Sequence, residues 1–211
     1  MKSNHISMLH LAFLLALSPA ALAGNTWYVN GVSGSDSNNC MTPTTACKTI
    51  GHAISLAVSG DLINVAAGTY TENLSVAFNL TVAGAGATTT IIDGGSVGRV
   101  VTISNANTLV KLSNLTLSNG HAGYGAGILN YGTLTLDYMT LTGNTVTSAS
   151  SFGDSGGAIS NIYPATLTIN HSTIRQNKVS STLNASLGGG IVNPTFAVAD
   201  VFRLFCSDFY C

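Results

Sequence analysis

The chain has 211 residues and very little charge, because only 7% of its residues are Asp, Glu, Lys or Arg and its formal net charge is −1. A chain with no basic stripe cannot gain much from counterion release on nucleic acid, and it has no Lys/Arg cluster for an anionic membrane surface. The composition therefore argues against nucleic acid as a partner. Removal of a short leader would leave enough residues for one domain with a sizeable core.

Residues 1–23 have the features of a signal peptide. Lys2 supplies a positive charge, and residues 8–17 form an apolar run. The small residues of an A-x-A cleavage site end at Ala23, so cleavage is expected between Ala23 and Gly24. The run is too short to span a bilayer comfortably, and a helical membrane anchor is the alternative. We expect an exported mature chain that has no transmembrane helix.

Residues 24–60 are predicted to form an N-terminal strand, a loop and a helix. Cys40 and Cys47 lie in the Gly/Ser/Asn-rich loop. In an exported protein such a pair is expected to form a disulfide, and zinc would need a second C-x-x-C or paired His nearby, which the sequence does not show. The second pair, Cys206 and Cys211, gives much weaker grounds for a disulfide.

Ile50, Ala53, Ile54 and Ala57 recur at helical spacing, and Gly60 follows as a candidate C-cap. A single amphipathic helix ahead of strands is expected to cover the open end of a stack, because a repeat array must hide its terminal hydrophobic face. A separate binding element is the alternative.

Residues 61–193 repeat themselves. GAGILNYGTLTLDYMTLTGN (125–144) resembles GGAISNIYPATLTINHSTIRQN (156–177), and GGGIVN begins the pattern again at Gly188. Equivalent isoleucines are 31 and 32 residues apart, and other equivalent pairs are 33 apart. A fixed period of this size indicates stacked repeats.

Within each repeat, apolar residues alternate with threonine. Leu136 and Ile169 are therefore expected to stack inside, and Asn144 and Asn177 to hydrogen-bond along the axis. A sandwich could use such strands, but it has no reason to repeat its sequence at a fixed period. The pattern predicts an all-β fold, a right-handed parallel β-helix with a short N-terminal capping helix.

The motifs YVNGVSGSDSNNC, LTVAGAGATTTIIDGG and the Gly-Gly-Ala-Ile repeats resemble the exported right-handed parallel β-helix proteins of bacteria, which have the pectin-lyase-like fold. Gly156–Ile159 followed by Ile174–Asn177 also resembles polymorphic outer-membrane-protein repeats, although Ile174 replaces their Phe. The resemblance covers residues 27–193 and implies fold and export. It does not imply one activity, because this fold carries lyases, hydrolases, adhesins and scaffolds.

Relatives of this kind carry further coils, whereas here the Gly/Thr/Asn texture ends at Pro194. Residues 194–211 are therefore expected to be an atypical tail, either an unusual cap or the product of truncation or a frame shift.

An enzyme of this fold needs carboxylates that lie close together. A polysaccharide lyase uses them to bind calcium beside a basic residue, and a hydrolase uses aspartates that lie close together on one face. The only candidates for a stacked site are Asp93, Asp137 and Arg175 as the base, whereas turn and strand positions explain both aspartates more simply. His121 is expected to be solvated. No cofactor or metal is predicted.

Two function classes remain. The first is an exported scaffold or adhesin, secreted or associated with the outer membrane, that presents a Thr/Ser/Asn-rich face to polysaccharide or cell-surface glycans. The second is a polysaccharide lyase or glycoside hydrolase. An ice-binding solenoid would need longer threonine ladders than the sequence provides. The candidates for stacking on sugar rings are Tyr124, Tyr131, Tyr138 and Tyr163.

Overall fold

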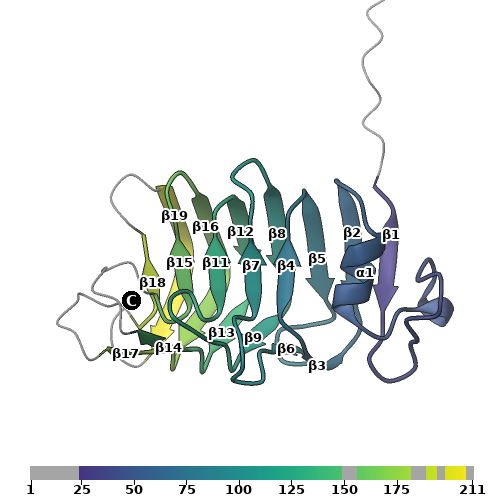
Figure 1. Ribbon diagram of the computed structural model, residues 1–211, viewed down its shortest axis with the longest axis horizontal. Helices are drawn as coiled ribbons and strands as arrows, with labels where there is room; N and C mark the ends of the chain where they lie inside the picture. Colours follow the sequence, from purple (N-terminus) through teal and green to yellow (C-terminus); the bar gives the residue numbers. More distant parts are fainter. Residues whose placement is uncertain (1–23, 149–155, 182–188, 194–197, 208–211) are drawn as a thin grey trace, which may run out of the picture.

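The computed structural model describes residues 24–148, 156–181, 189–193 and 198–207, so the expected signal peptide and the pairing of Cys206 with Cys211 lie outside it. Short strands dominate the described residues, and every strand pairing among them is parallel (Figure 1). The elements are β1 (Thr26–Val29), η1 (Pro43–Thr45, a 3-10 helix), α1 (Ile50–Leu56), β2 (Asp61–Val65), β3 (Gly68–Thr71), β4 (Leu74–Val76), β5 (Leu80–Gly84), β6 (Thr90–Asp93), β7 (Val101–Ile103), β8 (Leu109–Ser113), β9 (Thr116–Ser118), β10 (His121–Ala122), β11 (Ile128–Asn130), β12 (Thr133–Asp137), β13 (Thr140–Thr142), β14 (Thr145–Ser148), β15 (Ile159–Asn161), β16 (Thr166–Arg175), β17 (Lys178–Ser181), β18 (Ile191–Val192) and β19 (Val198–Ser207).

The chain passes through the same stacks of strands in turn. One stack runs β1-β2-β5-β8-β12-β16, and a second runs β3-β6-β9-β13-β16; the long strand β16 belongs to both and joins them. A third sheet runs β4-β7-β11-β15-β18, and a short one runs β10-β14-β17. Neighbours in each stack come from successive parts of the chain, which lie side by side along the long axis (Figure 1). This mostly β, parallel arrangement is compatible with the predicted parallel β-helix.

Aliphatic side chains form ladders inside the stacks. Leu136 pairs in register with Leu112 on one side and with Ile169 on the other, and all three are buried. The predicted contact between Leu136 and Ile169 is therefore confirmed. A second ladder joins Leu117, Leu141 and Ile174. Strands such as β12 bury one face only, which is why their sequence alternates, whereas β9, β11 and β15 are buried at every residue.

Two asparagine ladders run beside the aliphatic ones. The predicted pair is confirmed, since Asn144 Nδ2 donates to Asn177 Oδ1 at 2.9 Å. The second ladder was not predicted: Asn130 Nδ2 donates to Asn161 Oδ1, and Asn161 Nδ2 to Asn193 Oδ1, each at 2.7 Å. Asn130 and Asn161 are fully buried, and a buried amide costs free energy unless it is hydrogen-bonded.

The helix α1 lies at the β1 and β2 end of the stack (Figure 1). Thr49 caps its N-terminus through the His52 N–H, and the Glu72 carboxylate accepts the N–H groups of Ile50 and Gly51 at 2.9 and 2.7 Å. The predicted C-cap was wrong. The helix ends at Leu56 with Ala57 in extended conformation, because the following residues must turn early to enter β2.

The stack of strands continues past Pro194, where the Gly/Thr/Asn-rich composition of the sequence ends. The backbone of Val198–Ser207 forms β19 and pairs in parallel with β16, from Thr166 opposite Val198 to Arg175 opposite Ser207. Parallel pairing needs backbone groups in register rather than a particular side-chain composition, so a strand within the expected atypical tail can pair with β16.

Candidate functional site

The carboxylates proposed for an enzyme do not stack on one another. Asp93 ends β6 and Arg175 ends β16 in the second stack, and they are aligned through Ser118 and Thr142 on the two strands between them. Three strand spacings of about 4.8 Å separate them by roughly 14 Å. Asp137 ends β12 in the first stack, opposite different residues. The hypothetical site of Asp93, Asp137 and Arg175 is therefore not assembled.

The Asp93 carboxylate serves the turn that follows it. Its Oδ1 accepts the Gly95 N–H at 2.7 Å, and its Oδ2 accepts from Asn119 Nδ2 at 2.8 Å. This matches the interpretation of Asp93 as a turn residue. His121 is exposed, as expected, and its Nε2 lies 2.6 Å from Thr147 Oγ1.

Asp137, by contrast, lies in a cluster of chemically active side chains. Lys111 Nζ lies 3.7 Å from Asp137 Oδ2, and His171 Nδ1 lies 3.4 Å from Asp137 Oδ1. The Tyr138 ring stacks on the His171 ring with a centroid distance of 4.6 Å and an interplanar angle of 7°. These four residues form one polar cluster on the outer surface, and we call it the corner cluster.

The corner cluster exists because one backbone conformation repeats at the corner between the two stacks. Asn114, Tyr138 and His171 occupy equivalent positions in three successive repeats, with φ of 56°, 53° and 48°. This left-handed conformation is uncommon for residues other than glycine. Coils of equal geometry place equivalent side chains on each other, so Tyr138 and His171 meet although they are far apart in sequence.

A line of polar residues leads from this corner across the first stack. Thr81, Lys111, Thr135 and Thr168 are paired in register on β5, β8, β12 and β16, and their side chains point outward between buried neighbours. We call these four residues the outer strip. A shallow groove of about 390 Å³ lies along it, and its lining includes Asn79, Thr81, Leu109, Lys111, Thr133 and Thr135.

The four predicted tyrosines lie in different surroundings. Tyr138 belongs to the corner cluster and is 53% exposed, and Tyr163 is exposed in the turn before β16. Tyr124 and Tyr131 lie near Arg99, whose guanidinium carbon is 5.2 Å from the centre of the Tyr124 ring. Burial raises the pKa of Tyr131, and the neighbouring Tyr124 adds to that rise. Tyr138 is linked to the outer strip through its neighbour Asp137, which pairs with Lys111.

The Arg99 guanidinium donates hydrogen bonds to the backbone of a nearby loop. Its Nε donates to the Gly125 carbonyl at 2.9 Å, and its Nη2 donates to the Tyr124 carbonyl at 2.9 Å. Burial lowers the pKa of Arg99, whereas Tyr124 and Tyr131 act in the opposite direction. These bonds assign Arg99 a structural role in holding residues 124–125.

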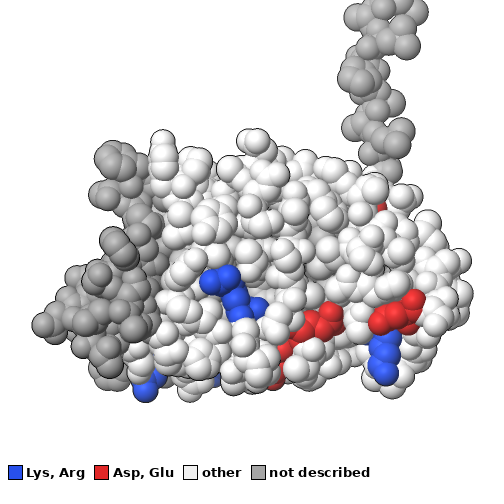
Figure 2. All heavy atoms as spheres, in the orientation of Figure 1, with Lys and Arg blue, Asp and Glu red and all other residues white. Residues whose placement is uncertain are grey.

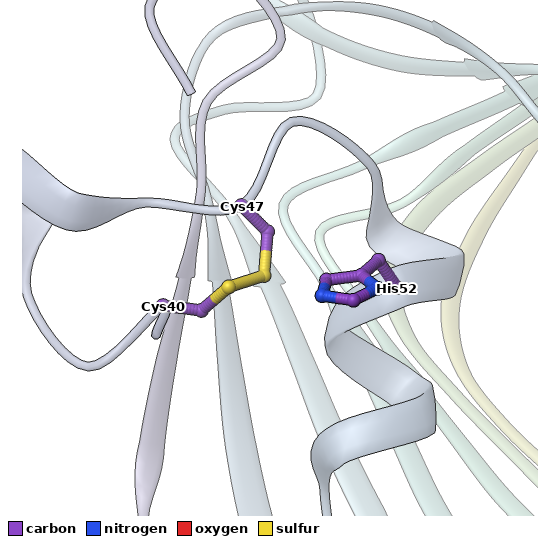
Figure 3. A group of neighbouring side chains, drawn as sticks. All are labelled: Cys40, Cys47 and His52. Atoms are coloured by element: carbon purple, nitrogen blue, oxygen red, sulfur yellow. A yellow bond between two sulfur atoms is a disulfide. The ribbon is translucent and has the colours of Figure 1, made fainter. Parts of the chain in front are cut away.

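The predicted disulfide between Cys40 and Cys47 is confirmed, with a Cα–Cα distance of 4.9 Å. The sequence shows no second C-x-x-C or paired histidine near these cysteines, but the structure places a single histidine beside them. The first turn of α1 brings the His52 ring beside the sulfurs, and the three ligand atoms lie within 4.8 Å of one another (Figure 3). A cysteine–histidine spacing of five residues across a loop–helix junction was the signal that could have found this group.

Charge is sparse on the face drawn in Figure 2, where isolated blue and red side chains interrupt a largely uncharged surface. This face therefore offers mainly uncharged groups to a ligand.

Helices in the described part of the chain lack the length and hydrophobicity needed to cross a bilayer.

Comparison with known proteins gives one family. The family described as "Protein of unknown function (DUF1565)" matches residues 32–199, which include the disulfide loop, α1 and the strands from β2 to the start of β19. No curated protein and no solved structure matches the chain.

Proposed function

The chain belongs to the DUF1565 family, since the match covers residues 32–199, and from this premise we propose that it is an exported right-handed parallel β-helix that binds glycans without cleaving them. The supporting observation is the outer strip beside the corner cluster. The strip presents aligned threonine hydroxyls and one ammonium group, and the corner cluster adds one stacked aromatic pair.

These groups suit a sugar chain. Threonine hydroxyls both donate and accept hydrogen bonds, and the amphipathic ring of Tyr138 can cover the apolar face of a sugar ring. The strip repeats at the strand spacing of about 4.8 Å, so an extended chain can meet several rungs at once. The groove is shallow, so each contact is weak and affinity comes from several contacts made together.

The enzyme alternative has less support. It requires carboxylates brought together on adjacent coils, and the register separates Asp93 from Asp137. Asp137, the carboxylate beside the outer strip, is engaged by Lys111 and His171. Export, to the medium or the outer membrane, rests on the signal-peptide features of residues 1–23, and sequencing the mature N-terminus should find Gly24 first.

Affinity electrophoresis of the mature chain tests the binding proposal, with neutral and acidic polysaccharides in the gel. We expect retardation by at least one polysaccharide, and we expect Tyr138→Ala to weaken binding about three- to tenfold. Tyr124→Ala is the matched control, because Tyr124 is similarly exposed but lies away from the strip, beside Arg99. Equal loss in both variants would contradict the assignment of the site.

Turnover assays on the same polysaccharides test the claim of no cleavage, with and without calcium. We expect no new reducing ends and no unsaturated product. Product that disappears in Asp93→Asn or Asp137→Asn would establish an enzyme and overturn the proposal.

A further inference from the structure

The group Cys40, Cys47 and His52 has the composition of a soft-metal site. Two cysteine sulfurs and one imidazole nitrogen are ligands that Zn²⁺ prefers, and a site with three protein ligands leaves the fourth position to solvent. In Figure 3 the His52 ring, carried by α1, lies beside the sulfur atoms of the two loop cysteines. Both cysteines are fully buried, while His52 is partly exposed and gives solvent a route to the group.

The three ligand atoms lie within 4.8 Å of one another, so the group is compact enough to surround one ion. Zn–S bonds of about 2.3 Å in a tetrahedral site place two sulfurs about 3.8 Å apart. A disulfide holds its sulfurs about 2 Å apart, so metal binding requires reduction and a separation of the sulfurs by nearly 2 Å.

The backbone around the group is anchored independently of the disulfide. Asp36 accepts the N–H groups of Lys48 and Thr49, each at 2.9 Å, and Thr49 caps the helix that carries His52. The Tyr28 N–H donates to the Cys40 carbonyl, and the Cys47 N–H donates to the Tyr28 carbonyl, each at 2.8 Å. These bonds keep both cysteines beside β1 when the sulfurs are no longer joined.

We infer that Cys40, Cys47 and His52 form a redox-controlled Zn²⁺ site, closed in the disulfide form and open to the metal after reduction. A dithiol supplies two electrons and two protons and becomes a disulfide itself, so the S–S bond breaks and each sulfur becomes a thiol. A phosphine achieves the same reduction with water as the source of protons and becomes a phosphine oxide. Zn²⁺ then displaces both thiol protons and binds two thiolates and the neutral imidazole. Two buried thiolates are costly alone, and the metal charge compensates them.

Cobalt titration tests this inference, with Co²⁺ as the spectroscopic probe. The mature chain is used with Cys206→Ser and Cys211→Ser, so that only the loop pair provides thiols. After anaerobic reduction with a phosphine we expect one equivalent of Co²⁺ to produce thiolate charge-transfer and tetrahedral d–d bands, and equimolar Zn²⁺ to abolish them. The disulfide form should show neither band.

The contribution of His52 distinguishes a built site from two reactive thiols. We expect His52→Ala to weaken Co²⁺ binding at least about tenfold, whereas His121→Ala, at an exposed histidine elsewhere, should leave it unchanged. Far-UV circular dichroism of the reduced chain monitors the fold. Absence of the bands in the reduced chain, or equal affinity in His52→Ala and its parent, overturns the inference whether or not the reduced chain remains folded.

Discussion

The Asp61 carboxylate holds the N-terminal end of the structure together. Asp61 is 1% exposed, and it accepts three hydrogen bonds, from Asn25 N at 2.7 Å, Trp27 Nε1 at 2.8 Å and Val58 N at 2.9 Å. These donors belong to β1, to the residue before it and to the segment after α1. One side chain therefore ties the strand and the helix segment to the first rung of the stack.

Asp61→Asn replaces one acceptor oxygen with an NH₂ group. If Oδ1 of the new asparagine keeps the hydrogen bond from Asn25, its Nδ2 faces the N–H groups of Trp27 and Val58. An NH₂ group cannot accept a hydrogen bond from either of them, so both bonds are lost. A hydrogen bond to a charged group contributes about 1.5–3 kcal/mol, and two are lost. We expect the free energy of unfolding to fall by about 3–5 kcal/mol, a large part of a typical total of about 5–15 kcal/mol.

Urea unfolding of the mature chain measures this loss. Trp27 is the only tryptophan, so its fluorescence reports the site directly, while far-UV circular dichroism reports the whole stack. Asp93→Asn is the matched control. It makes the same chemical change in a turn on the surface, and it should cost less than about 1 kcal/mol. A loss below about 1 kcal/mol for Asp61→Asn would refute the reasoning.

The same carboxylate makes stability depend on pH. Burial raises the pKa of Asp61, but the hydrogen bonds from Trp27, Val58 and Asn25 outweigh burial and hold the pKa below 3.8. A lowered folded-state pKa gives stability that is complete above about pH 4 and is lost as the pH falls through the folded-state value. The parent chain should lose more stability between pH 5 and 2 than Asp61→Asn does.

Other rungs of the stack give further predictions. Leu136→Ala should lower the free energy of unfolding by about 2–5 kcal/mol, whereas Thr135→Ala on the outer face should change it by less than about 1 kcal/mol in the same urea titration. Asn161→Ala should cost about 2–3 kcal/mol, because it removes the acceptor of one buried ladder bond and the donor of the next. Replacing Cys40 and Cys47 together by alanine should cost about 2–3 kcal/mol, and thiol titration of the denatured, unreduced parent should find neither sulfur free. Glycan binding should change little with added salt, because few charges are involved; a steep salt dependence would point to an ionic mode of binding.

The interior of the stacks could be predicted from the sequence because two regular patterns in the sequence determine which residues are buried and which lie on one another. Alternation of period two marks the buried face, and a fixed repeat places Leu136 on Ile169. The ladder of Asn130, Asn161 and Asn193 obeys the same rule, and its members are 31 and 32 residues apart. It was missed because asparagine in this chain also occurs at many turns, although here it continues an aliphatic ladder: Asn130 pairs with Ile103.

The surface could not be predicted in the same way, because it depends on where the corners fall. Tyr138 and His171 have the same 33-residue separation as Leu136 and Ile169, but the period does not reveal that both lie at a left-handed corner where their rings stack on the outer surface. The coils also differ in length at their outer loops while the paired strands stay in register. His52 shows the same limit, since only the junction between the loop and α1 brings it to the cysteines.

Stacking in register also constrains how the outer strip can work. Each of the four paired strands contributes one side chain to the strip. The functional group on the surface therefore changes from one strand to the next, in the order Thr81, Lys111, Thr135 and Thr168. Lys111 is the only ionisable residue of the strip, and Asp137 lies 3.7 Å from its ammonium group, so the strip is close to neutral at every rung. A surface of this kind discriminates by hydroxyl geometry and ring stacking rather than by charge, which favours neutral sugar chains over acidic ones. Lys111→Ala should therefore weaken binding to neutral polysaccharide less than Tyr138→Ala does, and the opposite order would assign recognition to charge.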